Sequence, residues 1–187
     1  DRAKACKQAV NESRVSPEDV VGVGLDFTSC KMLPTLGDGT HLCLLEPLAS
    51  EPLAWPKLWK HHGAVAETDR INEVARERKE KWMKRYGGTI GLEWFWPKVM
   101  ETQNGAPTVY RATEVWVEAG DWLVWQLVGG PFPRCRPESL VRSTCQAGYK
   151  AMWNRKAGWP SREFFAALNP KLRDVIAEKM PGRLMPP

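Results

Sequence analysis

One unbroken apolar run near the amino end constrains the fold of this chain more than any other feature. Residues 20–25 read Val-Val-Gly-Val-Gly-Leu, a stretch that is too short for a helix and rich in β-branched residues. Such a run is typical of a strand buried on both faces in the parallel sheet of an α/β protein. We therefore expect residues 20–25 to form an interior strand of a mixed sheet.

Small polar residues follow this expected strand, namely Asp26, Thr28, Ser29 and Cys30. Open α/β sheets bind their ligands at the carboxyl ends of strands, so a ligand is expected here. Farther along, residues 59–62 read Trp-Lys-His-His and combine an aromatic face, a cation and two imidazoles. These are the groups that a sugar-binding cleft needs.

Composition indicates an ordinary globular protein. With 187 residues, 43% hydrophobic and 26% charged, the chain can form one sizeable domain or two small ones. The net charge of +5 is spread along the chain and favours anionic ligands only weakly. The basic residues at 76–81 could be read as a nucleic-acid patch, but acids interleave with them and favour a solvated helix face.

The cysteines predict a reducing compartment. They are five in number, Cys6, Cys30, Cys43, Cys135 and Cys145, and none forms a C-x-x-C pair. The first residues are charged and no apolar run is long enough to span a membrane, so we expect a soluble cytoplasmic protein with free thiols. No metal site is expected, because His61 and His62 are adjacent and their side chains diverge.

Apart from the apolar run, most of the chain is predicted to be helical. Apolar periodicity and capping residues predict helices over 1–13, 67–86, 92–102, 122–128, 161–168 and 170–180. Residues 114–118 alternate as a short strand does.

Four stretches invite comparison with a known family: residues 22–30, 58–62, 93–98 and 145–153. In their residues, order and spacing they resemble the FGGY family of carbohydrate kinases, and most of all its members that phosphorylate L-ribulose. The resemblance covers nearly the whole chain. It implies two actin-like lobes, each with a ribonuclease-H-like α/β core, and it implies that residues 1–187 form an incomplete sugar-binding first lobe.

The resemblance also implies a reaction. ATP with Mg²⁺ would phosphorylate a ketopentose, L-ribulose to L-ribulose 5-phosphate, a step of L-arabinose breakdown. The phosphate-binding hairpin, the second lobe and the catalytic Asp would lie outside these residues, so no catalytic residue is assigned and the 187 residues alone are expected to be inactive. Neither nucleic acid nor a membrane is an expected partner, and a homodimer is left open.

Substrate-binding roles follow from the resemblance, and each has a structural alternative. Thr28, Ser29 and Cys30 would contact the sugar, or simply end the strand. Trp59 would pack on the CH groups of the sugar, or belong to the core. Lys60 and Lys150 would donate to sugar oxygens, or lie on the surface. His61 would touch substrate or satisfy local hydrogen bonds, and Glu93 would reach the sugar or cap a helix.

Three further readings stay open. Residues 24–28 could be the phosphate hairpin, although a helix precedes them and the Trp-Lys-His cluster follows, which favours sugar binding. The protein could be another FGGY kinase, such as a xylulokinase-like enzyme. It could also be a non-catalytic sugar-binding module derived from such a kinase.

Overall fold

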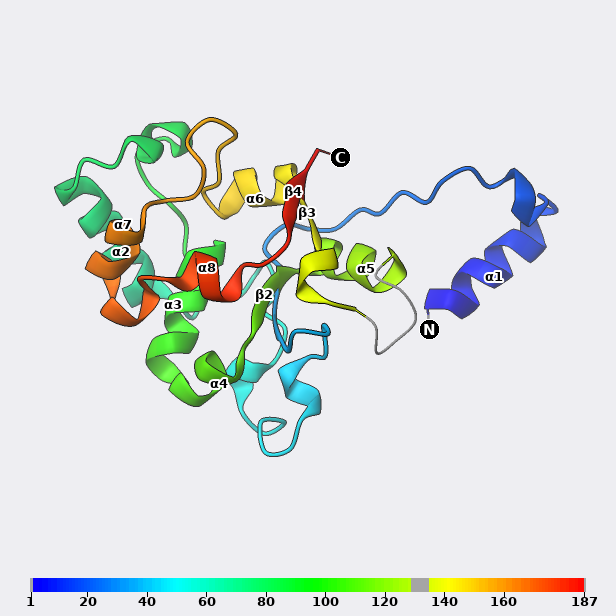
Figure 1. Ribbon diagram of the computed structural model, residues 1–187, viewed down its shortest axis with the longest axis horizontal. Helices are drawn as coiled ribbons and strands as arrows, with labels where there is room; N and C mark the ends of the chain where they lie inside the picture. Colours follow the sequence, from blue (N-terminus) through cyan, green and yellow to red (C-terminus); the bar gives the residue numbers. More distant parts are fainter. Residues whose placement is uncertain (1, 129–134, 187) are drawn as a thin grey trace.

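The computed structural model describes residues 2–128 and 135–186 as short helices around two small sheets (Figure 1). The α-helices are α1 (Arg2–Ser13), α2 (Val65–Glu77), α3 (Phe95–Gly105), α4 (Pro107–Ala112), α5 (Ala119–Val128), α6 (Thr144–Lys150), α7 (Arg162–Leu168) and α8 (Val175–Lys179). The strands are β1 (Met32–Thr35), β2 (Val115–Glu118), β3 (Val141–Ser143) and β4 (Arg183–Met185). The α/β class predicted from the sequence is thus observed.

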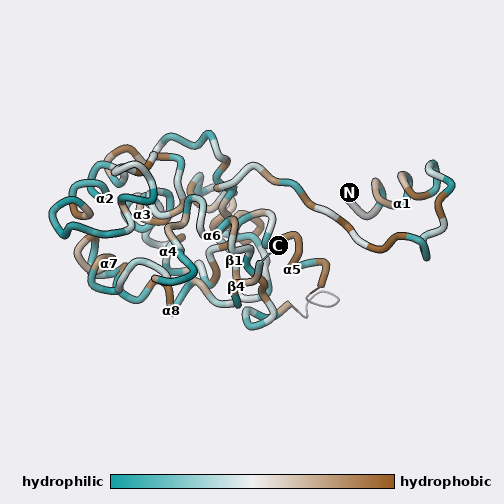
Figure 2. The backbone as a smooth tube through the Cα atoms, turned by 90° about the horizontal axis from the view of Figure 1, so that it is seen from above, coloured by the Kyte–Doolittle hydropathy of each residue, from teal (hydrophilic) through white to brown (hydrophobic). Residues whose placement is uncertain are grey.

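The prediction that residues 20–25 form a buried interior strand is wrong for this structure. The segment is extended but unpaired, Val21 is fully exposed and Val23 is 72% exposed. It runs as an apolar tether between the body of the molecule and α1 (Figure 2). A strand needs a neighbour for its backbone N–H and C=O groups, and no described strand pairs with this one.

The single mixed sheet is also not observed, because the strands form two separate pairs. Strands β1 and β2 pair antiparallel, with Leu33 opposite Val117 and Thr35 opposite Val115. Strands β3 and β4 pair parallel, with Arg142 opposite Leu184. All four residues of both β1 and β2 are buried, so this pair forms the centre of the molecule.

A large aromatic core joins α2, α3 and α7. Trp96 packs edge-to-face on Phe165 with ring centroids 4.7 Å apart, and Trp82 packs in the same way on Phe164 at 5.2 Å. Ser161 caps α7 as predicted, because its side chain accepts a hydrogen bond from the Phe164 N–H. This packing fixes α3 between the β1–β2 pair and the other helices.

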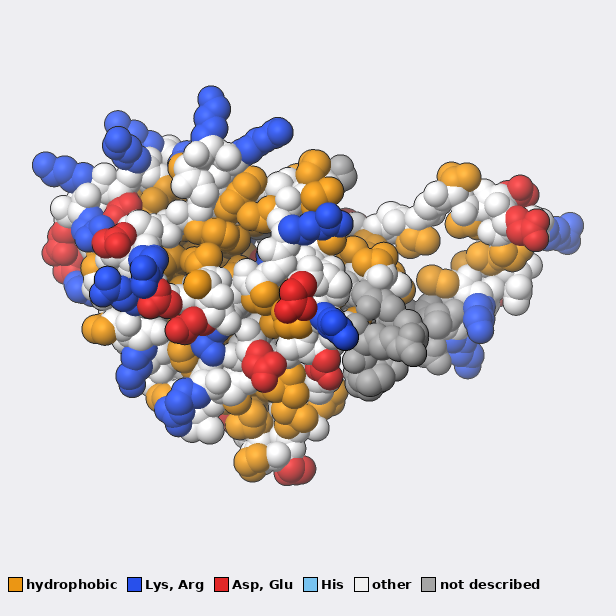
Figure 3. Space-filling view, viewed as in Figure 1, with side chains coloured by type: hydrophobic (Ala, Val, Ile, Leu, Met, Phe, Trp, Pro, Cys, Tyr) orange, Lys and Arg blue, Asp and Glu red, His pale blue; other side chains and the backbone are white. Residues whose placement is uncertain are grey.

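The predicted long helix over 67–86 is split in two. Helix α2 ends at Glu77, Lys79 has a left-handed φ of 53°, and a 3-10 helix follows over Lys81–Tyr86. Lysine and arginine side chains are interspersed with aspartate and glutamate on the face shown in Figure 3. Residues 76–79 and 81 are exposed and Glu80 is half-buried, which confirms the prediction of a solvated face at 76–81.

Candidate functional site

Residues at and near the start of α3 contact residues from the other stretches of the predicted site. Asn72 holds the approach to this helix, since its side chain both donates to the Ile90 carbonyl and accepts from the Ile90 N–H, at 3.1 and 2.9 Å. Pro97 stands in the first turn of α3, where its missing N–H costs no hydrogen bond. Glu93, Lys98 and Glu101 are presented from this one short region.

Lys98 connects two stretches that lie far apart in sequence. Its side chain is fully buried, and its Nζ lies 2.8 Å from the carbonyl oxygen of Cys30 and 2.8 Å from that of Leu58. Burial lowers the pKa of this ammonium, while the charges of nearby Cys30, Glu118 and Glu93 act in the opposite direction. The turn at Ser29 and Cys30 is therefore held beside the segment that leads to Trp59.

Cys30 has a backbone conformation that few non-glycine residues adopt. Its φ is +62° and its side chain is completely buried. Burial first, and then the charge of Glu118, raise the pKa of its thiol far above the ordinary value. The Cys30 backbone also hydrogen-bonds the carboxyl group of Glu118. Such strained residues persist where their surroundings hold them in place.

Lys150 and Glu93, both predicted to bind substrate, form an ion pair. Lys150 Nζ lies 2.9 Å from Glu93 Oε1, with side chains 15% and 25% exposed. Desolvation opposes the charge on each, but their mutual hydrogen bond and attraction outweigh it, so the pKa of Lys150 is raised and that of Glu93 is lowered. Both remain charged at neutral pH.

The Lys150 ammonium lies near the 29–30 turn. Its charge, with those of Lys98, Glu93 and Glu118, acts on the pKa of the Cys30 thiol. Helix α6 is fixed on both sides of Lys150: Tyr86 Oη donates to the Gly148 carbonyl at 2.8 Å, and Trp96 Nε1 donates to the Ala151 carbonyl at 2.7 Å. Three of the predicted stretches therefore meet here: Lys98 joins the 93–98 stretch to Cys30, and Glu93 joins it to Lys150.

The Trp-Lys-His stretch contributes mostly exposed groups. Trp59 is 49% exposed, Lys60 and His62 are exposed, and His61 is half-buried. His61 Nε2 lies 2.6 Å from Glu101 Oε2 on α3. Thr28 is exposed and Ser29 half-buried beside Cys30. The Trp59 ring is thus about half exposed to solvent, whereas His61 has a hydrogen-bonding partner in Glu101.

Sequence reasoning missed Lys98, Glu101 and Glu118. Lys98 carried a signal, because it is the only charged residue in the otherwise apolar run Phe-Trp-Pro-Lys-Val-Met at 95–100. A lysine inside such a run must be buried with partners for its ammonium. Glu118 carried a weaker signal as the acid that ends strand β2.

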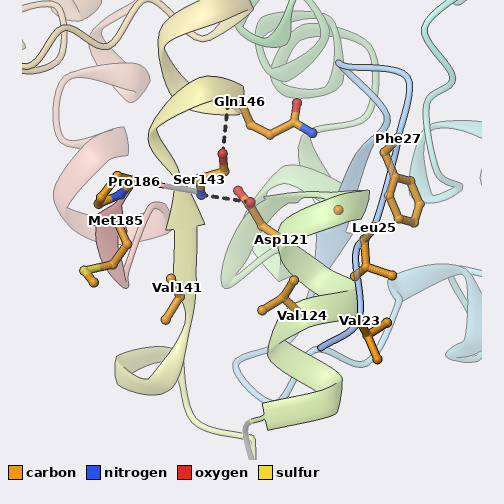
Figure 4. A pocket seen from close by; sticks show the side chains of 11 residues that line it. Val23, Leu25, Phe27, Asp121, Val124, Val141, Ser143, Gln146, Met185 and Pro186 are labelled. Carbon is orange, nitrogen blue, oxygen red and sulfur yellow. Dashed lines mark hydrogen bonds between the residues drawn. The ribbon is translucent and has the colours of Figure 1, made fainter. Parts of the chain in front are cut away.

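A separate cavity of about 300 Å³ is lined in part by α5, the helix that carries Asp121 (Figure 4). Its walls are largely apolar and come from the 23–27 segment, α5, β3 and the carboxyl end. Asp121 Oδ1 accepts the Ser143 N–H at 2.9 Å there, so this buried carboxylate ties α5 to the end of β3. Burial raises the pKa of Asp121 to about 6, against the opposing effects of Ser143 and Arg142.

Among residues 2–128 and 135–186, no three His, Cys, Asp or Glu side chains converge in a way that could hold a metal ion. None of the described helices has the length and apolar character needed to cross a membrane.

Comparison with known proteins gives consistent relatives. No family model matches the chain. It is 44% identical over 171 residues to the ribulokinase of Bacillus licheniformis, covering 91% of this chain and 29% of the relative. It is 42% identical over 184 residues to the ribulokinase of Anoxybacillus flavithermus, covering 98% of this chain and 31% of the relative. The ribulokinase of Mycolicibacterium smegmatis is 42% identical over 176 residues, covering 94% and 30%.

These matches confirm the resemblance predicted from the sequence. The chain spans only 29–31% of the length of these curated relatives. It is therefore similar to one segment of a ribulokinase.

Proposed function

We propose that this chain, a ribulokinase-like segment, is the sugar-binding part of a kinase that phosphorylates a ketopentose, with L-ribulose as the first candidate. Its place would be in the first of two actin-like lobes, with ATP and Mg²⁺ bound mainly by other segments. Similarity to several ribulokinases across more than nine-tenths of the chain supports a sugar kinase over a nucleic-acid module.

One observation supports the proposal: three of the residues predicted to bind sugar, Cys30, Glu93 and Lys150, interact with one another around the start of α3. Lys150, Glu93 and Cys30 belong to three different stretches, yet their charged or polar groups act on one another.

Lys150 would orient the sugar. Its ammonium has three N–H donors, and Glu93 accepts one of them, so two remain to donate to sugar hydroxyls. Glu93 would keep the ammonium charged and could accept a hydrogen bond from a neighbouring hydroxyl with its second oxygen. Ser29 and Thr28 would add hydroxyl groups, and Trp59 would shield the CH face.

Orientation of this kind is what phosphoryl transfer requires of an acceptor site. Catalysis depends largely on positioning the two reactants and on stabilising the charge of the transferred group. The residues of this chain would contribute the first part, by holding one hydroxyl in a fixed place and limiting its access to water.

The test is a coupled ADP-release assay on the full-length protein that contains this chain. L-ribulose, D-xylulose and glycerol would be compared at saturating ATP and Mg²⁺. The proposal expects the highest kcat/KM for L-ribulose. Preference for D-xylulose or glycerol would assign another substrate to the same site, and sugar-independent ATP hydrolysis alone would refute the proposal.

A further inference from the structure

We infer that Lys98 is a positioning residue for the sugar site, although it is not expected to touch the sugar. This inference rests on the proposed function and deepens it. It concerns how the 29–30 turn and the segment before Trp59 are kept in register, which the sequence resemblance does not explain.

The position of Lys98 is unusual for a lysine. The side chain is completely inaccessible, and its two described hydrogen bonds both go to backbone carbonyls outside its own helix. A buried ammonium is costly, so partners must compensate for its lost hydration. A structural lysine could meet that need within its own turn, but Lys98 instead bridges residues separated by 28 positions in the chain.

Cys30 shows what the bridge holds. Cys30 has a left-handed backbone conformation, and two side chains hydrogen-bond its backbone: Lys98 donates to the Cys30 carbonyl, and the Glu118 carboxyl group also bonds the Cys30 backbone. Both of these ionisable side chains are buried: Lys98 is 0% exposed and Glu118 is 4% exposed. The turn that presents Thr28 and Ser29 is thereby fixed without contact between these buried groups and solvent.

The hydrogen bond from Lys98 to the Leu58 carbonyl also holds the segment that leads to Trp59. Leu58 immediately precedes Trp59, and the next fixed point along that segment is the His61–Glu101 pair, also on α3. Trp59 and Lys60 therefore project from a short loop held at both ends by one helix. Lys98 sets the spacing between this loop and the 29–30 turn.

Lys57 offers a matched control. It is also buried, at 3% exposed, and its Nζ also donates to a backbone carbonyl, that of Leu53 at 2.8 Å. That contact is local and lies on neither sugar-contacting turn. Replacing either lysine by methionine removes a buried ammonium and keeps the length of the side chain, so general destabilisation should be similar in both variants.

The experiment compares Lys98→Met and Lys57→Met in the full-length protein. Amide hydrogen exchange is expected to accelerate in Lys98→Met at residues 28–31 and 58–61 together, and in Lys57→Met at neither. For the sugar, kcat/KM should fall about 100-fold in Lys98→Met, the size of loss that a misplacement of about 1 Å can cause. The KM for ATP should not change.

Two results would overturn the inference. One is unchanged exchange at either turn in Lys98→Met, and the other is an equal loss of sugar kcat/KM in Lys57→Met. If Lys98→Met does not fold, Lys98→Gln keeps a polar N–H donor but is one atom shorter, so its amide nitrogen cannot reach both carbonyls. It must then accelerate exchange in both turns, and no acceleration overturns the inference. If the wild-type protein uses no ketopentose, the proposed function fails, while the exchange result still decides the role of Lys98.

Discussion

At the scale of single residues, the candidate site is a set of ionisable groups at different depths. Lys98 and Glu118 are buried, the Lys150–Glu93 pair is partly buried, and Lys60 is exposed. We expect the depth to separate their roles: Lys98 and Glu118, which are buried, should act on the backbone, whereas the partly buried Lys150–Glu93 pair should be accessible to a ligand. Substitutions at the two depths should therefore have different consequences.

Lys150→Ala should weaken sugar use by about 1–3 kcal/mol in kcat/KM, the cost of losing a charge-assisted hydrogen bond in a closed cleft. The KM for ATP should hardly change, because none of the described contacts of Lys150 suggests a nucleotide site. Steady-state kinetics on the full-length protein measures both. Lys156→Ala, an exposed lysine in the following loop, is the matched control. Equal losses for ATP and sugar in Lys150→Ala would indicate an unfolded lobe instead.

Glu118 predicts a pH dependence of stability. Burial raises its pKa from 4.5 to about 8, with the charge of Asp121 adding to the rise and Lys98 opposing it. Between these two pKa values the folded state keeps the Glu118 proton that the unfolded state releases. Protonation of Glu118 therefore contributes its full share to the free energy of unfolding below about pH 4.5, and this contribution is lost as the pH rises through about 8. Glu118→Gln keeps an acceptor for the Cys30 N–H but does not titrate.

The difference in Tm between Glu118→Gln and the wild type should therefore grow in favour of the variant between pH 5 and pH 8, a window that lies inside the shift of Glu118 from 4.5 to about 8. Thermal unfolding of the full-length protein at several pH values measures this. Glu138→Gln, on an exposed turn, removes a carboxyl group away from the cluster and serves as control. A difference that is independent of pH would mean that Glu118 titrates alike in the folded and unfolded states.

At the scale of elements, the helices were predicted better than the strands, for a physical reason. The Ser161 cap, the start of α7 and the helix at the amino end depend on hydrogen bonds between near neighbours in sequence. A strand depends on a partner that its own sequence does not contain. The 114–118 prediction holds because β1 pairs with it, and the 20–25 prediction is wrong because no described strand does.

Contacts between residues far apart in the chain likewise could not be predicted from the sequence. The motif resemblance named Lys150 and Glu93 separately, but nothing in either stretch shows that they form an ion pair. Lys98 had a signal in its apolar surroundings, yet its two carbonyl partners are 68 and 40 residues away. The residues of the candidate site were proposed from the sequence, but the contacts between them could not be predicted from it.

The unpaired segment makes a prediction for the 187-residue chain. Thermolysin cleaves before bulky apolar residues in extended backbone that can leave its surroundings, and residues 20–25 are apolar, extended and exposed. Limited proteolysis followed by mass spectrometry should find the first cut in this segment. The equally apolar Val115–Glu118 strand is buried and paired, so it provides an internal control. A first cut inside β2 or α3 would contradict the arrangement described.

At the scale of the whole molecule, the 187 residues alone should not phosphorylate any sugar. They span less than a third of the length of the ribulokinases that they match. Under the proposed function these residues would orient the acceptor, but transfer also needs the donor to be positioned. The measurement is ADP release by the purified chain with L-ribulose, ATP and Mg²⁺. Sugar-dependent turnover above a heat-killed control would contradict it, and Asp26 would then be the first residue to test.

Helix α3 has one more consequence, which concerns insertions and deletions in the gene. Glu93, Lys98 and Glu101 reach three different parts of the chain from one short stretch. Adding one codon between Lys98 and Glu101 would turn every later side chain of the helix by about 100° and carry Glu101 away from His61. In a library of single-codon insertions, we expect active clones to be rare across residues 93–101 and common in the loop at 154–158, where the chain can lengthen without turning a shared helix.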